Sequence, residues 1–369
     1  MTTEWIQCTL GEQINLKRGY DLPRGKRHPG SIPIYSSAGL NGFHNVSASA
    51  APGVVIGRYG TIGESFYIEE DFWPLNTTLY VENFKGNNPK FIYYLLKTLN
   101  FHSLSDKSAV PGINRNHVHL LEVKVPDVDT QRVIAEILSC LDEKFELNQK
   151  INHNLEQQAQ AIFETWLATE ISEPWSLGSL SDIAVLNPLR TLKKGSIATY
   201  VEMASLPTSG SFPSNWEAKA YAGGAKFQNG DTLLARITPC LENGKTAYVN
   251  FLKDGEVAFG STEYVVLSPK EGYPHELLYL IARNKDFVDY AIKNMSGTTG
   301  RQRVSAEILS RYQIKIPPKD FVANFAKALS NIMNVIKHNS FENRTLATLR
   351  DTLLPKLMSG EIDVSDVKI

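Results

Sequence analysis

The stretch ELNQKINHNLEQQ, residues 146–158, places two asparagines in a helical pattern where the spacing calls for leucine. The pattern runs from Ile134 to Trp166, with seam positions alternately four and three residues apart. Eight of the ten seam positions are apolar, and the exceptions are Asn148 and Asn152. The pattern therefore predicts a coiled-coil-like helix whose single apolar stripe is interrupted by amides at its middle.

The same arrangement recurs 191 residues later in the chain. LEVKVP (121–126) precedes the first helix, and YQIKIP (312–317) precedes a second one. Moving the seam by 191 residues without a gap again places amides at its middle, at Asn339 and Asn343. Two unrelated amphipathic helices are the alternative, but an ungapped match over this length argues against them. We interpret the chain as an internal duplication.

The duplication extends through the segments that precede each helix. Four elements occur twice in the same order. They are a tryptophan with a Leu-Gly-type turn, a strand with a basic turn, a threonine-rich strand with a short helix, and a polar loop. The matching ranges are 4–19 with 174–188, 53–68 with 230–249, 76–98 with 261–283, and 108–120 with 296–309. Each half is therefore expected to be an α+β globule followed by a long helix. The expected parts are a first globule (1–127), a first helix (128–171), a second globule (172–318), and a second helix with the C-terminal tail (319–369).

Neither helix can bury its apolar stripe alone, so we expect the two helices to pack as an antiparallel coiled coil. If a pseudo-twofold axis relates the halves, the residue numbers of facing positions have a constant sum. The sum 491 places Asn148 opposite Asn343 and Asn152 opposite Asn339, where they would select one register. Leu141 against Arg350 breaks the apolar matching, unless the stem of the arginine packs while its head reaches water. In the alternative, the asparagines face water or a partner protein.

The composition is that of an ordinary globular protein with a formal net charge of −1. No apolar run approaches the roughly 18 residues of a membrane span, and the start MTTEWIQCTL is no signal peptide, so we expect a cytoplasmic protein. Cys8, Cys140 and Cys240 supply neither a disulfide framework nor a CxxC metal site. The expected first helix holds 3 basic and 8 acidic residues, which leaves the globules able to carry basic surfaces such as residues 17–28.

The order of the repeated elements resembles the specificity subunit of type I restriction-modification systems. The resemblance covers essentially the whole chain and includes the tail LRDTLLPKLMSGEIDV (349–364). It implies that each globule is a target recognition domain that reads one half of a split site in double-stranded DNA. It also implies that two modification (methyltransferase) subunits dock on the helices and that restriction (motor-nuclease) subunits join them. S-adenosylmethionine, ATP and Mg²⁺ are then expected on these partners, and no cofactor on this chain.

Residues that contact DNA are expected in two elements of each globule, a turn and a later loop. Base edges are read by side chains with paired donors or donor–acceptor sets, and phosphates are bound by cations and small polar groups. The candidates of the first globule are Arg58, Tyr59, Lys107, Ser108, Asn114 and Arg115, and those of the second are Arg236, Thr238, Thr298, Thr299, Arg301, Gln302 and Arg303. Two alternatives stay open: the loops cap the next helix or strand, or the turn arginines only bind local carbonyls.

Catalytic patterns are missing from the sequence. The Asn/Asp-Pro-Pro-Tyr/Phe element of amino-methyltransferases is absent, and GRYGTIG (57–63) lacks the Gly-Lys-Ser/Thr that completes a phosphate loop. His117 and His119 alternate in a segment expected to approach a strand, without a third metal ligand. We therefore expect a non-catalytic recognition subunit. The alternative, a coiled-coil adaptor with two protein-binding globules, would leave the basic and amide-rich loops unexplained, and a nuclease would need an active site that no pattern marks.

Overall fold

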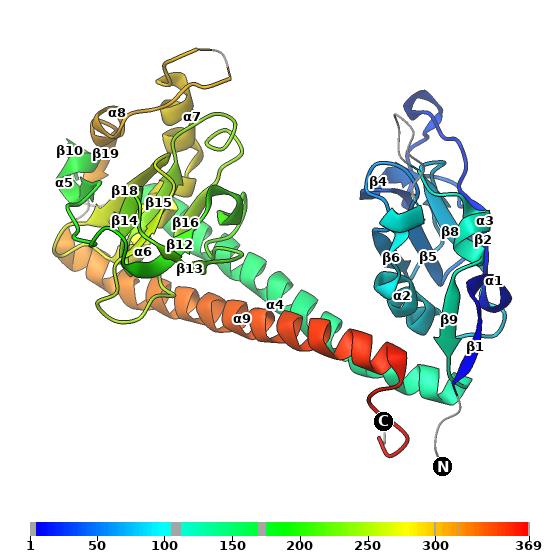
Figure 1. The fold of residues 1–369 in the computed structure, drawn as a ribbon. Helices are drawn as coiled ribbons and strands as arrows, with labels where there is room; N and C mark the ends of the chain where they lie inside the picture. Colours follow the sequence, from blue (N-terminus) through cyan, green and yellow to red (C-terminus); the bar gives the residue numbers. More distant parts are fainter. Residues whose placement is uncertain (1–4, 105–111, 169–174, 299, 317, 368–369) are drawn as a thin grey trace. The chain divides into compact units, whose positions relative to one another are not determined.

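The computed structural model describes residues 5–104, 112–168, 175–298, 300–316 and 318–367 (Figure 1). It divides into two compact units, one formed by residues 1–145 with 345–369 and the other by residues 146–344. Each unit therefore contains one globule and a part of both long helices. In the described part of the chain, no helix is long and apolar enough to cross a membrane.

The first globule is built on two sheets and a short ribbon. The larger sheet is antiparallel with the order β2-β8-β5-β6, and the smaller has the order β4-β3-β7 with β3 and β7 parallel. The ribbon pairs β1 with β9. The strands are β1 (Ile6–Thr9), β2 (Asn15–Arg18), β3 (Ile32–Ser36), β4 (Gly39–His44), β5 (Gly53–Gly57), β6 (Ser65–Ile68), β7 (Trp73–Pro74), β8 (Thr78–Asn83) and β9 (Glu122–Val125). The helical segments are α1 (Leu10–Gln13), η1 (Arg24–Lys26), α2 (Pro89–Thr98), η2 (Phe101–Leu104) and α3 (Arg115–His119).

The second globule repeats this plan. Its larger sheet has the order β11-β18-β15-β16, its smaller sheet the order β13-β12-β17-β14, and β10 pairs with β19. The strands are β10 (Ser176–Ser179), β11 (Ala184–Leu186), β12 (Ile197–Val201), β13 (Glu217–Ala220), β14 (Ala225–Phe227), β15 (Thr232–Ala235), β16 (Thr246–Tyr248), β17 (Ala258–Gly260), β18 (Tyr264–Pro269) and β19 (Gln313–Ile316). The helical segments are α5 (Leu180–Ile183), η3 (Met203–Ser205), α6 (His275–Arg283), α7 (Lys285–Lys293) and α8 (Ala306–Ser310).

The two globules agree in detail as well as in strand order. Both α1 and α5 begin with a capping box, in which a hydroxyl residue and an acidic residue satisfy the first backbone groups of the helix. β3 is parallel to β7, and β12 is parallel to β17. In the larger sheets Gly57 pairs with Thr78, and Ala235 pairs with Tyr264. Thr78 therefore corresponds to Tyr264, and the preceding residues Thr77 and Glu263 correspond to each other. The ungapped match of 76–98 with 261–283 had instead aligned Thr77 with the residue before Glu263.

The two long helices are α4 (Val128–Ala168) and α9 (Lys319–Ser359), each of 41 residues. Their stripes are buried together with the globules. In the first unit Ile134, Leu138 and Leu357 belong to one core with residues of the larger sheet. In the second unit Ala159 and Leu329 belong to a core that also contains α6. The helices are therefore part of the globular cores, which explains why neither needs to be stable alone.

The asparagines at the middle of the stripe meet inside the second unit. The Nδ2 of Asn148 donates to Asn343 Oδ1 at 2.9 Å and to Glu342 Oε2 at 2.7 Å. The Nδ2 of Asn339 donates to Asn152 Oδ1 at 2.9 Å. From the first pair to the second, the residue number rises on α4, from 148 to 152, and falls on α9, from 343 to 339. The two helices therefore run antiparallel. These are the facing pairs expected from the constant sum, and Asn148 is fully buried there.

Carboxylates of α4 hold an equivalent tyrosine in each unit. In the first unit Tyr94 of α2 donates its hydroxyl to Asp142 at 2.8 Å, and Arg350 of α9 donates to the other oxygen of Asp142 at 3.0 Å. In the second unit the hydroxyl of Tyr279 on α6 donates to Glu156 at 2.8 Å. Arg350 thus has a specific ionic partner beside the seam, which the apolar matching did not anticipate.

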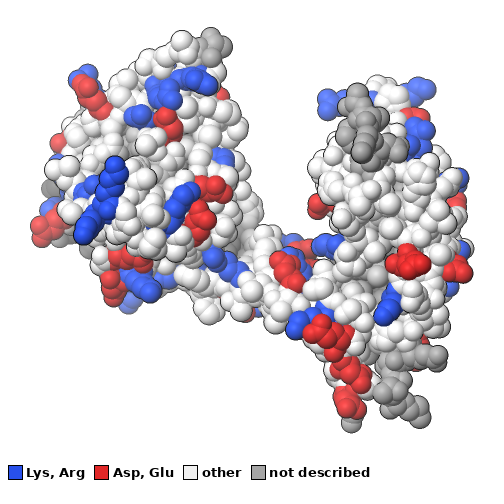
Figure 2. Space-filling model, viewed as in Figure 1, with Lys and Arg blue, Asp and Glu red and all other residues white. Residues whose placement is uncertain are grey.

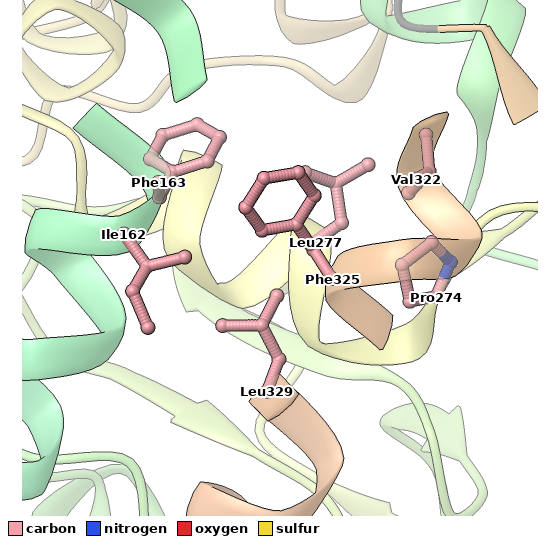
Figure 3. Close-up of a pocket in the computed structure, with 7 residues that line it drawn as sticks. All are labelled: Ile162, Phe163, Pro274, Leu277, Val322, Phe325 and Leu329. Atoms are coloured by element: carbon pink, nitrogen blue, oxygen red, sulfur yellow. The ribbon is translucent and has the colours of Figure 1, made fainter. Parts of the chain in front are cut away.

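An apolar pocket lies between α4, the start of α6, and α9 in the second unit (Figure 3). The lining side chains point toward one another and are Ile162, Phe163, Pro274, Leu277, Val322, Phe325 and Leu329. A water-sized sphere can move its centre through only about 10 Å³ of it. That is close to the least space one water needs, and the lining offers it no polar side chain. The pocket is therefore a packing gap in the core.

We predict that the amides of the seam are energetically coupled. Asn148→Leu leaves Asn343 and Glu342 without this donor in a buried site, which is expected to lower the free energy of unfolding by about 1–3 kcal/mol. The double variant N148L/N343L makes the position apolar on both helices and should lose less than the sum of the two single changes. Urea unfolding of the four proteins measures this coupling. Strictly additive losses would show that the two asparagines do not act as a pair.

Candidate nucleic-acid interface

Each globule brings its predicted turn and loop together at the end of the larger sheet. In the first globule an isolated bridge joins Tyr59 to Gly112, and the amide of Ile113 donates to the carbonyl of Arg58 at 3.2 Å. In the second globule the corresponding bridge joins Ile237 to Arg303, and the amide of Val304 donates to the carbonyl of Arg236 at 3.0 Å. The turn after β5 and the loop before α3 thus form one surface, and the turn after β15 and the loop before α8 form its counterpart. We call each of these surfaces a junction.

In the first globule the turn arginine lies over an aromatic ring. The guanidinium of Arg58 is 4.4 Å from the ring centroid of Tyr59, and its Nε donates to the carbonyl of Ile113 at 3.3 Å. Gly112 passes so close that a Cβ there would lie 2.2 Å from the Tyr59 ring. Among the described residues no acidic side chain pairs with Arg58. Its charge is therefore oriented by stacking but is not neutralised.

In the second globule one carboxylate binds two arginines. The Nε of Arg236 donates to Glu263 at 3.1 Å. Arg303 donates from Nε at 2.9 and 3.0 Å and from Nη2 at 2.7 Å to the two oxygens of the same carboxylate. The Nη1 of Arg303 also donates to the carbonyl of Arg301 at 3.1 Å. We call Arg236, Glu263 and Arg303 the arginine–carboxylate triad.

The two arginines of the triad lower the pKa of Glu263. Hydrogen bonding from Arg303 is the largest influence that lowers the pKa of Glu263, burial opposes it, and Arg236 lowers the pKa further. The pKa of Glu263 in the folded protein lies below its value in the unfolded chain. Ionised Glu263 therefore stabilises the fold fully at pH values above the unfolded-state pKa. That contribution is lost as the pH falls through the folded value. At neutral pH the triad carries one net positive charge.

The other predicted contact residues differ in exposure and in local duties. Asn114, Arg115, Thr298 and Arg301 are exposed, and Gln302 is half-buried. Asn114 also caps α3, because its side chain accepts from the amide of Asn116 at 3.0 Å. Thr238 accepts from the amide of Gln302 at 3.1 Å and so joins turn to loop. Lys107, Ser108 and Thr299 lie outside the described residues.

His117 and His119 do precede a strand, β9, but the expectation that they alternate along an extended segment was wrong. They lie on the helix α3, and His119 Nε2 accepts from the amide of Leu16 at 2.9 Å. Burial is the largest influence lowering the pKa of His119, with Arg115 and Lys85 adding to it, which favours the neutral ring that this bond requires. In the described part of the chain, no group of three or more His, Cys, Asp or Glu residues is placed to hold a metal ion.

Three further features lie on the surfaces of the two globules. Figure 2 shows Lys and Arg side chains at the end of the second globule that carries the loop between α7 and α8. A groove of about 340 Å³ borders Arg236 on the same globule, and Lys226 and the fully exposed Leu189 line it. In the first globule Arg24 and Lys26 of η1 are exposed. The surface beside the second turn therefore combines cations with apolar and amide groups, which are the groups that contact phosphates and base edges.

Glu263 was not predicted from the sequence. It lies 27 residues from Arg236 and 40 residues from Arg303, in the segment STEY that leads into β18. No spacing rule connects positions so far apart. The alignment of the two halves marks it only as a difference, because Thr77 holds the equivalent place in the first globule.

Comparisons with known proteins agree on one family. The family model for the type I restriction modification DNA specificity domain matches residues 3–157 and 172–347. The HindI specificity subunit of Haemophilus influenzae is 24% identical over 357 residues, covering 74% of this chain and 77% of that one. The MjaIX specificity subunit of Methanocaldococcus jannaschii is 26% identical over 336 residues, covering 80% and 74%. The S subunit structure from M. genitalium superposes with a TM-score of 0.62 at 17% identity over 96% of both chains, which shows the same fold.

We predict that Arg303→Ala raises the pKa of Glu263 toward its ordinary value and that Arg236→Ala raises it less. The physical reason is that Arg303 supplies more hydrogen bonds to the carboxylate than Arg236 does. NMR titration of the chain with ¹³C-labelled glutamate side chains measures both shifts. A pKa of Glu263 that stays low in R303A would contradict the assigned cause.

Proposed function

The chain belongs to the family of type I restriction-modification DNA specificity domains, and from this premise we propose that its two globules read the two halves of a split DNA site. The family is one of recognition subunits without catalytic activity of their own. One observation carries the proposal: the same junction of turn and loop is built twice, on sheets of the same strand order. Two such surfaces in one chain suit a target with two separate specified parts.

The chemistry of each junction suits the reading of base pairs. Arginine can bind guanine through two N–H groups in the major groove, and amides can bind adenine. The first junction offers Arg58, with Asn114 and Arg115 beside it. The second offers Arg301 and Gln302 next to the triad. Because the side chains of the two junctions differ while the sheets agree, we propose that the two half-sites have different sequences.

The long helices are proposed to carry the partners of the complex. Membership of the family implies that the chain acts with DNA and with other restriction-modification subunits. We propose two modification subunits on the helical region, restriction subunits beyond them, and a cytoplasmic location. Exposed apolar residues on the helices, Leu147 and Ile151 on α4 and Val335 on α9, support a protein-binding role there. S-adenosylmethionine would then be used by the modification subunits, and ATP with Mg²⁺ by the restriction subunits.

A pure protein-interaction adaptor fits the structure less well. Such a function accounts for the helices and for their exposed apolar residues. It gives no reason for two equivalent junctions that expose arginines and amides, and the matching family is one of DNA specificity domains. We therefore do not favour it.

We predict that the target is bipartite and modular. Replacing residues 1–125 by the first globule of another family member should change one half of the sequence bound by the assembled complex and leave the other half unchanged. Selection from a random-sequence duplex library, followed by sequencing, measures both halves at once. A continuous short target, or a change in both halves, would refute the division of labour between the globules.

We predict that Arg301→Ala weakens or relaxes one half-site only. Arg301 is exposed on the loop, and a bidentate arginine–guanine contact is worth about 1–3 kcal/mol of discrimination. Binding to duplexes with single-base changes in each half measures the effect. Arg311→Ala is the matched control, since Arg311 is an exposed arginine of the same globule that pairs with Glu307 outside the junction. Equal effects of the two substitutions would assign Arg301 to general charge attraction.

A further inference from the structure

The triad differs from an ordinary surface ion pair in its position. The backbone carbonyl of Glu263 accepts from the amide of Arg236 at 3.0 Å, just as the carbonyl of Thr77 accepts from the amide of Arg58 at 2.9 Å. Glu263 therefore occupies the structural place of Thr77. The second globule has a carboxylate where the first has a hydroxyl, beside the turn proposed to face DNA.

A carboxylate at this place works against phosphate attraction. DNA binding gains from each cation that replaces a counterion, and an added negative charge reduces that gain. The triad also contributes too little to the stability of the fold for stabilisation to explain its presence. The side chains of Arg236, Glu263 and Arg303 are 32%, 23% and 40% exposed, and partly exposed ion pairs contribute little to stability. A role in positioning the arginines accounts for it better.

The hydrogen bonds show how positioning would work. A guanidinium has five N–H donors in one plane. Glu263 and the carbonyl of Arg301 engage the Nε, Nη2 and Nη1 of Arg303. Two N–H groups of Arg303 then remain without a partner among the described residues, which is the number that guanine O6 and N7 require. Arg236 uses only its Nε, so its Nη groups also remain available in the described structure.

We propose that Glu263 is a specificity-determining positioning residue of the second globule, which fixes Arg236 and Arg303 so that their remaining N–H groups read base edges. This role rests on the proposed function, because it requires the second junction to face DNA. The carboxylate lowers general affinity for phosphates and raises discrimination between correct and incorrect base pairs. Pre-ordered donors fit the correct base, and they lose more binding free energy on a wrong base than mobile donors would. In the first globule Arg58 has a ring and a carbonyl instead, so its half-site is read without such a carboxylate.

The test compares Glu263→Gln with the wild type in the complete complex with its modification subunits. Duplexes selected from a random library by the wild type define the target, and exchange of residues 1–125 assigns each half to a globule. Replacing the carboxylate should reduce discrimination against single-base changes in the second globule's half-site by about 10-fold, while discrimination in the first half stays unchanged. Affinity for unrelated duplex DNA should rise, because a negative charge is lost.

Two variants separate positioning by Glu263 from a simple change of charge. Glu242→Gln removes an equally negative, exposed side chain from the same globule and should raise non-specific affinity without altering discrimination. Glu263→Asp keeps the charge and should restore part of the discrimination. If the wild type selects no sequence, the proposed function fails. If the wild type selects a split target but E263Q, with an unchanged melting temperature, discriminates as well as the wild type in both halves, the positioning role fails alone. Loss of discrimination in both halves would likewise overturn it.

Discussion

One constraint underlies the structure: a long helix with a single apolar stripe cannot bury that stripe by itself. The chain meets the constraint through duplication, because α4 and α9 provide stripes of the same pattern and the globules cover what remains. In each unit the stripe residues share a core with a globule, as Leu138 and Leu357 do in the first unit. The amide pairs are the polar exception. They place hydrogen bonds where a shifted register would bury amides against leucine, and this favours one alignment over its neighbours.

The sequence was most informative where periodicity or repetition carried the signal. Heptad spacing located the long helices, and an ungapped offset located Asn339 and Asn343. The constant sum for antiparallel helices then made them the facing partners of Asn152 and Asn148. Contacts between positions far apart in the chain left no such trace. The bond from Arg350 to Asp142 and the triad around Glu263 depend on how folded elements meet, so neither could be predicted from spacing. The short helix α3 was missed for a different reason: its five residues are too few to show a helical period.

The globules show how one scaffold can hold different surfaces. The strand order and the backbone bonds between turn and loop are shared and depend on backbone geometry, and the capping boxes are shared through side chains of the same kind. The side chains that project from the junction are not shared, as Thr77 and Glu263 illustrate. A substitution at the junction changes what the surface binds, whereas a substitution in the sheet changes whether the junction forms. Recognition and stability can therefore vary almost independently in this architecture.

The first unit also has an unusual relation to the order in which a ribosome makes the chain. Its core includes Leu357, Met358 and Val364, and Gly360 lies against the ring of Trp5. These residues are synthesised after the whole second globule. A nascent first globule must therefore leave part of its apolar core uncovered until the second globule and α9 have been made, although domains usually fold in N-terminal order. The globule that emerges first thus depends for its complete core on residues that are made after the second globule.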